Sequence, residues 1–217
     1  MSNPSTSSDG LSYELLRQSV EWRLLGLLFE PPEPEWREEL VLLAAEVADE
    51  SLSAAARQAH EEADAGLYHS TLGPGGPASP REVSYHVTMV PGGLLSELQA
   101  YYEAFGYQTR CSESPDHVAV ETGFVAFMQL KQAYASLGGQ SEEREVTAEA
   151  TQRFLAEHLA VIAEPLATAL QQSGIGYLAT VAELLRQRAG PTAPSGTVGH
   201  VSDDQAVRGL ESKDNPV

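Results

Sequence analysis

The sequence predicts an all-α protein, built as a single-domain helical bundle with disordered N- and C-terminal tails. Leu, Ala, Glu and Gln are abundant, and only 7% of the 217 residues are aromatic; such a composition favours helices. Apolar residues recur at spacings of three and four along most of the chain, which is the pattern of an amphipathic helix. Residues 1–11 and 190–217 lack this pattern, so we expect a disordered N-terminus, a helical domain over 12–189 and a flexible C-terminal tail.

The first half of the domain is expected to contain helices separated by a long loop. Leucines at helical spacing predict a helix over 13–29, and the prolines that follow it end that helix. Further helices are expected over 36–47 and 52–67, the second of them more polar. Residues 73–80 read Gly-Pro-Gly-Gly-Pro-Ala-Ser-Pro, which cannot be helical, and long ordered loops of this kind are often functional.

The second half is expected to consist of longer helices, over residues 94–105, 115–138, 145–172 and 177–188. The third of these contains Pro165, which is expected to kink it. Glycines at the ends of the second and third helices are good termination signals. The only candidate for a strand is 83–90, and its pattern is weak.

The densest polar cluster of the chain lies where the helix over 115–138 begins. Residues 113–117 read Glu-Ser-Pro-Asp-His. Ser114 suits an N-cap, Pro115 suits the first helical position, and the helix dipole favours an anion at Asp116. Because capping alone does not require so many polar side chains, we expect this cluster to be functional. His158, on a later apolar helix, is expected to matter if it meets the cluster.

Charge and cysteine content restrict the partners and the compartment. The formal net charge is −18, which disfavours nucleic acid and acidic membranes as partners and favours a basic peptide. Cys111 is the only cysteine, so no internal disulfide can form, in keeping with a reducing cytosol. No secretory signal and no apolar run of membrane-spanning length is present. We therefore expect a cytoplasmic protein without stable membrane association.

A metal site is the main alternative to a partner-binding cluster. His117 and Glu121 are spaced i, i+4, so both can face the same way, and His86 and His158 could complete a ligand set. This pattern would give a helical metal-dependent enzyme or sensor. The H-E-x-x-H signature is absent, so we expect neither a metal site nor a catalytic residue. A general helical adaptor for another partner is a third interpretation.

The landmarks together resemble the TorD/DmsD/NarJ family of molybdoenzyme maturation chaperones, the redox enzyme maturation proteins. The signature of that family has an acidic residue, a proline and an Asp-His pair opening a helix, and then a Glu and a Phe-Met run. Here it corresponds to residues 113–117, Glu121 and the stretch 124–128, with the proline displaced by one residue. Residues 72–76 are similar to the Gly-Pro loop of the family, and 154–159 to its late His-Leu motif, although Ile162 replaces the aromatic residue that often follows.

The resemblance implies a TorD-like bundle that is not an enzyme and carries no cofactor. Such a chaperone binds the N-terminal segment, often a twin-arginine signal peptide, of a molybdopterin-containing oxidoreductase catalytic subunit. It assists folding, cofactor insertion and assembly in the cytoplasm before export, as a monomer or a dimer. The residues expected to bind the partner are Glu113, Asp116, His117, Glu121, Tyr101, Tyr102 and His158.

Overall fold

The computed structural model describes residues 4–87 and 90–191, and side chains from residue 10 onward. It confirms the all-α prediction, since these residues contain no strand and form a bundle of helices. The weak strand candidate at 83–90 begins instead in a 3₁₀ turn, Glu82–Tyr85. The α-helices are α1 (Pro4–Leu27), α2 (Trp36–Glu46), α3 (Glu50–Glu62), α4 (Ala65–Thr71), α5 (Pro91–Phe105), α6 (Val118–Leu137), α7 (Ser141–Phe154), α8 (Ala160–Ser173) and α9 (Gly176–Ala189).

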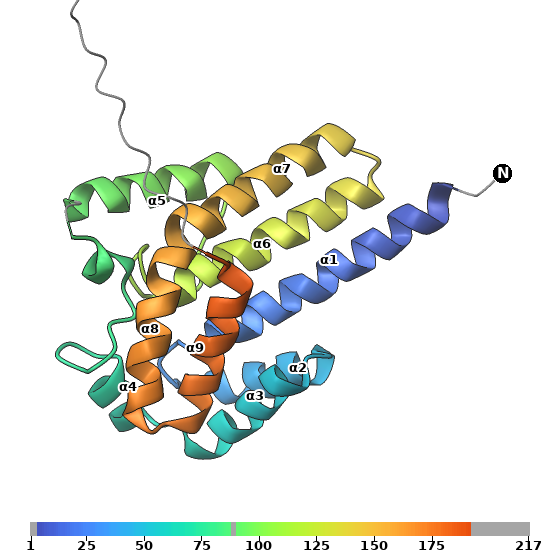
Figure 1. Ribbon diagram of the computed structural model, residues 1–217. Coiled ribbons are helices and arrows are strands. Elements are labelled where there is room, and N and C mark those ends of the chain that lie inside the picture. The colour runs from blue at the N-terminus through green and yellow to red at the C-terminus, as the bar shows by residue number, and fades with distance from the viewer. Residues whose placement is uncertain (1–3, 88–89, 192–217) are drawn as a thin grey trace, which may run out of the picture.

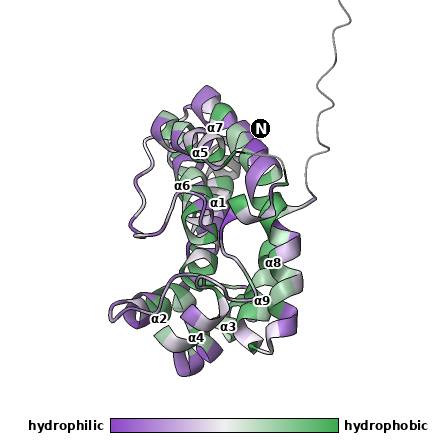
Figure 2. Ribbon diagram, turned by 90° about the vertical axis from the view of Figure 1, so that its left-hand side faces the viewer, coloured by the Kyte–Doolittle hydropathy of each residue, from purple (hydrophilic) through white to green (hydrophobic). Residues whose placement is uncertain are grey.

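The long helices α1, α6 and α7 lie side by side, with α6 in the middle (Figure 1). The helix pair α8 and α9 packs together at one end of this layer, and α3 contacts α9 while α2 contacts both α1 and α3. Figure 2 shows hydrophilic residues concentrated at the outer ends of the bundle, near α4 and α7. Hydrophilic residues therefore lie mainly on the outside of an apolar bundle (Figure 2).

Helix α6 is the centre of the core. Val118, Val120, Phe124 and Met128 are all fully buried, and they do not fall on one narrow stripe of the helix. A helix that is apolar on most of its circumference must be covered on several sides. Here α1 covers one side and α7 another.

Two element boundaries differ from the sequence prediction. Helix α1 begins at Pro4, so residues 4–11 are helical rather than disordered; proline is well suited to the start of a helix. The helix expected over 52–67 is two helices, because Asp64 accepts a hydrogen bond from the backbone N–H of Leu67 at 2.9 Å and caps α4. Of the C-terminal tail, 192–217 lie outside the described residues.

The bend expected at Pro165 occurs earlier in the chain. Residues Leu155–Leu159 form a π-helical turn, in which the N–H of Ala160 bonds to the carbonyl of Leu155. Helices α7 and α8 leave this turn in different directions (Figure 1), and Pro165 lies within α8. π-Helical turns are frequent at functional sites, and this one carries His158.

The α1–α6 contact leads to a prediction for Gly26. A Cβ atom at this position would lie 2.4 Å from Oγ1 of Thr122 and 3.2 Å from the carbonyl oxygen of Ala119. We expect Gly26→Ala to lower the free energy of unfolding by about 1–2 kcal/mol, because the overpacking exceeds the gain in helix propensity. Urea unfolding followed by circular dichroism would measure the change.

Gly92→Ala is the matched control, since a Cβ atom at Gly92 in α5 would have no neighbour within 4 Å. This variant should be as stable as the wild type or slightly more stable. Equal stability of the Gly26 and Gly92 variants would contradict a close α1–α6 packing at Gly26.

Candidate functional site

The polar cluster at the start of α6 is built differently from its prediction. The N-cap is His117, whose Nδ1 accepts a hydrogen bond from the N–H of Ala119 at 3.1 Å. Helix α6 therefore begins at Val118 rather than at Pro115. Ser114 does not cap the helix; its hydroxyl donates to the carboxylate of Asp116 at 2.6 Å. The residues before the helix thus form a turn that presents Asp116 to another segment.

That other segment is the end of the Gly-Pro loop. Residues Arg81 and His117 form an isolated antiparallel bridge, in which the N–H of Glu82 donates to the carbonyl of Asp116 at 2.8 Å. The guanidinium of Arg81 donates to Oδ1 of Asp116 from Nη2 at 2.8 Å and from Nε at 3.0 Å. Burial alone would raise the pKa of Asp116, but the hydrogen bonds from Arg81 and Ser114 outweigh it and hold the pKa below its ordinary value. Asp116 is therefore an ionised carboxylate in the interior.

His117 connects this bridge to α4. Burial lowers its pKa to about 4, so the ring is neutral at physiological pH. Because Nδ1 accepts the capping bond, we assign the proton to Nε2, which lies 3.4 Å from the hydroxyl of Tyr68. That hydroxyl in turn donates to the carboxylate of Glu113 at 3.4 Å. A chain of polar contacts therefore runs from the helix start to the partly exposed Glu113.

Glu82 is the centre of a second polar group, beside the first. Its carboxylate lies 2.7 Å from Nε2 of His86 and 3.2 Å from Nδ1 of His158. Glu121 is fully buried near it, and its oxygens have no hydrogen-bond partner among the described residues. Burial, followed by the negative charges of Glu82 and Asp116, raises the pKa of Glu121 well above its ordinary value. Glu121 therefore keeps its proton to a higher pH than an exposed glutamate does.

The structure gathers most of the predicted site residues but places them in the interior. Asp116, His117, Glu121 and His158 are at most 2% exposed, so a partner cannot touch them in this conformation. Tyr102 is also buried, and its hydroxyl donates to the carbonyl of Pro115 at 2.8 Å. Glu113 and Tyr101 are half-buried. Direct partner contacts by this set remain a prediction.

The alternative metal set is not assembled as predicted. His86 and His158 both contact Glu82, whereas His117 is engaged by Tyr68 and by the start of α6. Sequence reasoning missed the residues that hold the two groups together, which are Arg81, Glu82 and Tyr68. The signal available for the first two was their position directly after the Gly-Pro loop.

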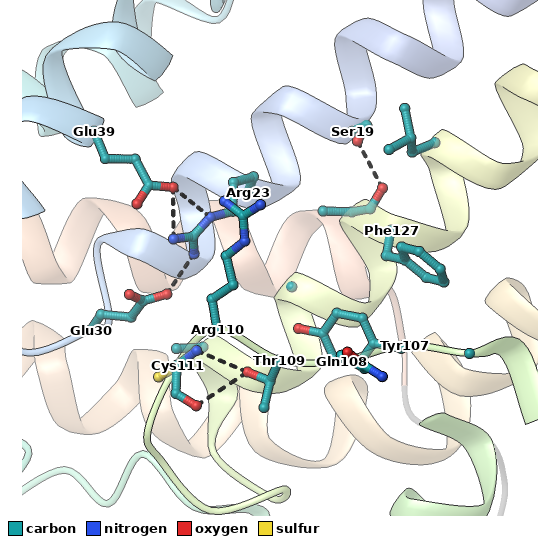
Figure 3. A pocket seen from close by; sticks show the side chains of 15 residues that line it. Ser19, Arg23, Glu30, Glu39, Tyr107, Gln108, Thr109, Arg110, Cys111 and Phe127 are labelled. Carbon is teal, nitrogen blue, oxygen red and sulfur yellow. Dashed lines mark hydrogen bonds and ion pairs between the residues drawn. The ribbon is translucent and has the colours of Figure 1, made fainter. Parts of the chain in front are cut away.

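A groove lies on the other face of α6, between that helix, α1 and the α5–α6 connection (Figure 3). Its volume is about 450 Å³. The floor is a stripe along α6, and Tyr107 from the connection faces it, its ring centroid 5.5 Å from that of Phe127. The residues of the stripe are Ala119, Gly123, Ala126, Phe127 and Leu130.

The groove is charged at the end formed by α1 and α2. Arg23 is bound there between the carboxylates of Glu30 and Glu39, the latter at 2.8 Å from Nη2 (Figure 3). Burial raises the pKa of Glu30 despite the opposing effect of Arg23. Cys111 also lines this end, and burial raises the pKa of its thiol to about 11. The thiol is therefore protonated at neutral pH and is a poor nucleophile.

Comparison with known proteins identifies the family. The family model described as Nitrate reductase delta subunit matches residues 33–167, which is more than half of the chain and includes the buried polar network and the floor of the groove. No curated protein matches the chain. Within the described residues, no helix combines the length and the apolar character needed to cross a membrane. The chain thus belongs to the nitrate reductase delta subunit family, the TorD/DmsD/NarJ group of molybdoenzyme maturation chaperones.

Proposed function

We propose that this chaperone binds the N-terminal segment of a molybdopterin oxidoreductase catalytic subunit in the groove between α1, α6 and the α5–α6 connection. The observation that carries the proposal is the composition of this groove, which has an apolar floor and an acidic end. Binding there would keep the catalytic subunit in the cytoplasm while its cofactor is inserted and its fold is completed, before any export.

The floor suits a short amphipathic helix. From Ala119 to Leu130 the stripe extends roughly 16 Å along α6, which matches about three turns of a bound helix. Phe127 in the floor and the neighbouring Tyr107 supply aromatic contact area. An apolar run in the bound segment would lie against them in the helix-in-groove mode of peptide recognition.

The acidic end suits a basic pair, such as the arginines of a twin-arginine signal. Four glutamates line it or the adjoining hollow, namely Glu30, Glu33, Glu35 and Glu39. Arg23 and Arg110 are the basic residues of the same lining, so this end carries a net negative charge. Charge-assisted hydrogen bonds from incoming arginines would be favourable there.

In this proposal the buried signature residues act by positioning the groove rather than by contacting the peptide. His117 fixes the end of the α5–α6 connection to α6, Asp116 fixes it to Arg81, and Tyr102 holds Pro115. The same connection supplies Tyr107 and residues 108–111 to the wall of the groove. Glu113 and Tyr101 are half-buried and lie outside the lining of the groove, so they would contact parts of the partner beyond the bound segment.

The proposal can be tested by co-purification from the native host. Tagged full-length protein is expected to recover one molybdopterin-binding catalytic subunit, and deletion of the N-terminal segment of that subunit should abolish recovery. A fluorescent peptide of that segment, about 30 residues long, then allows the affinity to be measured by anisotropy.

Phe127→Glu is expected to weaken peptide binding at least tenfold, because it places a carboxylate on the apolar floor. Tyr134→Glu is the matched control, since Tyr134 lies on the same helix outside the groove and is 65% exposed. Unchanged affinity of the Phe127 variant would contradict the groove as the binding site. If the catalytic subunit is still recovered after its N-terminal segment has been deleted, that segment is not the part that the chaperone binds.

A further inference from the structure

Three side chains with metal-ligand chemistry meet at the π-helical turn, away from the groove. They are Glu97 of α5 and the adjacent Glu157 and His158 of the turn, each offering one ligand atom within 4.8 Å of the others. Glu97 is exposed, Glu157 half-buried and His158 buried. The cluster therefore reaches from the surface into the core.

His158 has the hydrogen bonding expected of a metal ligand. Its Nδ1 is 3.2 Å from the carboxylate of Glu82, whereas its Nε2 is buried and has no hydrogen-bond partner among the described residues. The side chain is only 3% exposed. A buried polar atom without a partner costs free energy, and a carboxylate on the far nitrogen of a histidine is the usual support of a metal-bound ring. With Nδ1 donating to Glu82, the unpartnered Nε2 thus belongs to the tautomer that a cation requires.

The other contacts of Glu157 leave room for a cation. Arg153 donates to both carboxylate oxygens, at 2.9 and 3.0 Å, and Tyr101 donates to one of them at 3.2 Å. Arg153 is a surface side chain, 66% exposed, so it can move into solvent when a cation replaces it. The hydroxyl of Tyr101 can remain, because a carboxylate has lone pairs for both a donor and a metal.

We propose that Glu97, Glu157 and His158 bind a divalent transition-metal ion, zinc in particular, that links α5 to the π-helical turn. One imidazole and two carboxylates are suitable ligands for zinc, whereas magnesium and calcium prefer oxygen ligands alone. Three protein ligands leave a fourth position for water or for a group of a partner. Binding the ion requires Arg153 to leave the carboxylate of Glu157 and the three ligand atoms, which lie within 4.8 Å of one another, to close around it.

The test uses full-length protein without a histidine tag. Titration calorimetry with zinc chloride is expected to show one zinc ion bound per chain, at these three ligands. Co²⁺ bound there should give the visible absorption of a four-coordinate site. Glu97→Gln should weaken zinc binding at least tenfold and remove the Co²⁺ absorption. Because Glu97 is on the surface, this variant should fold as the wild type does.

Glu103→Gln is the control, since Glu103 is an exposed carboxylate on the same helix outside the cluster; its zinc affinity should equal that of the wild type. Absence of stoichiometric binding would overturn the proposal. So would zinc binding that Glu97→Gln leaves unchanged, because the ion would then be bound elsewhere. Peptide binding in the groove is measured separately, so failure of either proposal can be recognised without the other.

Discussion

Arg81→Ala is expected to lower the free energy of unfolding by about 3 kcal/mol at neutral pH. The variant removes the guanidinium bonded to Asp116, whose side chain is fully buried. Breaking a buried ion pair from one side costs about 3–5 kcal/mol, because the remaining charge has no compensation. We expect the lower end of that range, since Arg81 is itself 43% exposed and Ser114 still donates to Asp116.

The pH dependence of this stability loss shows whether the unpaired carboxylate of Asp116 causes it. In the wild type the pKa of Asp116 is below its ordinary value of 3.8, so its stabilising contribution is present above that value and is lost as the pH falls through the folded-state pKa. Without Arg81, burial raises the pKa of Asp116 instead. The stability difference between wild type and variant should therefore be largest at neutral pH. It should begin to shrink as the pH falls through the raised pKa of the variant, above 3.8, and stop shrinking only below the lowered pKa of the wild type.

Arg144→Ala provides the comparison, because Arg144 forms a surface ion pair with Glu145 at 3.4 Å. Such pairs contribute roughly 0–1 kcal/mol. Urea unfolding of both variants at several pH values would measure the contrast. An Arg81 variant that loses no more stability than the Arg144 variant would mean that water, not Arg81, compensates Asp116.

The fold was predictable from the sequence because its signals are local. The leucines of α1 and the glycines after α6 mark helices without reference to any other segment. The missed break between α3 and α4 also has a local cause, the capping side chain of Asp64. An aspartate in a polar helix is a weak signal by itself, because the same residue is tolerated inside a helix.

The site was predictable only in part because its key contacts are long-range. Residues 113–117 carry an obvious signature, but their conformation depends on Arg81, 35 positions earlier in the chain. The ion pair with Arg81 holds Asp116 before the helix, and the cap passes from Ser114 to His117. Residue spacing cannot show which of two nearby residues, Ser114 or His117, caps the helix when a distant arginine decides it. They also cannot show that Glu97 meets His158, since nothing in the sequence connects α5 to the π-helical turn.

Glu121→Gln is expected to stabilise the protein at neutral and alkaline pH. Glu121 is fully buried and has no hydrogen-bond partner in the part of the chain that the structure describes, and burial together with Glu82 and Asp116 raises its pKa well above the ordinary 4.5. The folded state therefore holds a proton that the unfolded state releases. That contribution to stability is complete below the unfolded-state pKa and is lost as the pH rises through the folded-state pKa.

Each pH unit in that window removes about 1.4 kcal/mol from the free energy of unfolding of the wild type. Glutamine has nearly the same shape and does not titrate, so the variant should lack this slope. The advantage of the variant should be near zero at pH 4.5 and grow as the pH rises toward the folded-state pKa of Glu121. Urea unfolding at pH 5, 6, 7 and 8 would show the divergence.

Glu145→Gln is the control, because Glu145 is 72% exposed and its removal should not change the pH slope. Parallel pH profiles for wild type and Glu121→Gln would contradict a raised pKa of Glu121 in the folded state. The variant can also be tested with the fluorescent peptide of the N-terminal segment. If it is more stable than the wild type but binds that peptide less well, the role of Glu121 is not to stabilise the core. Glu121 lies in the first turn of α6, the helix that forms the floor of the groove. Its carboxyl group would then support binding by positioning α6, and the loss of stability that it causes is of a kind common at functional sites.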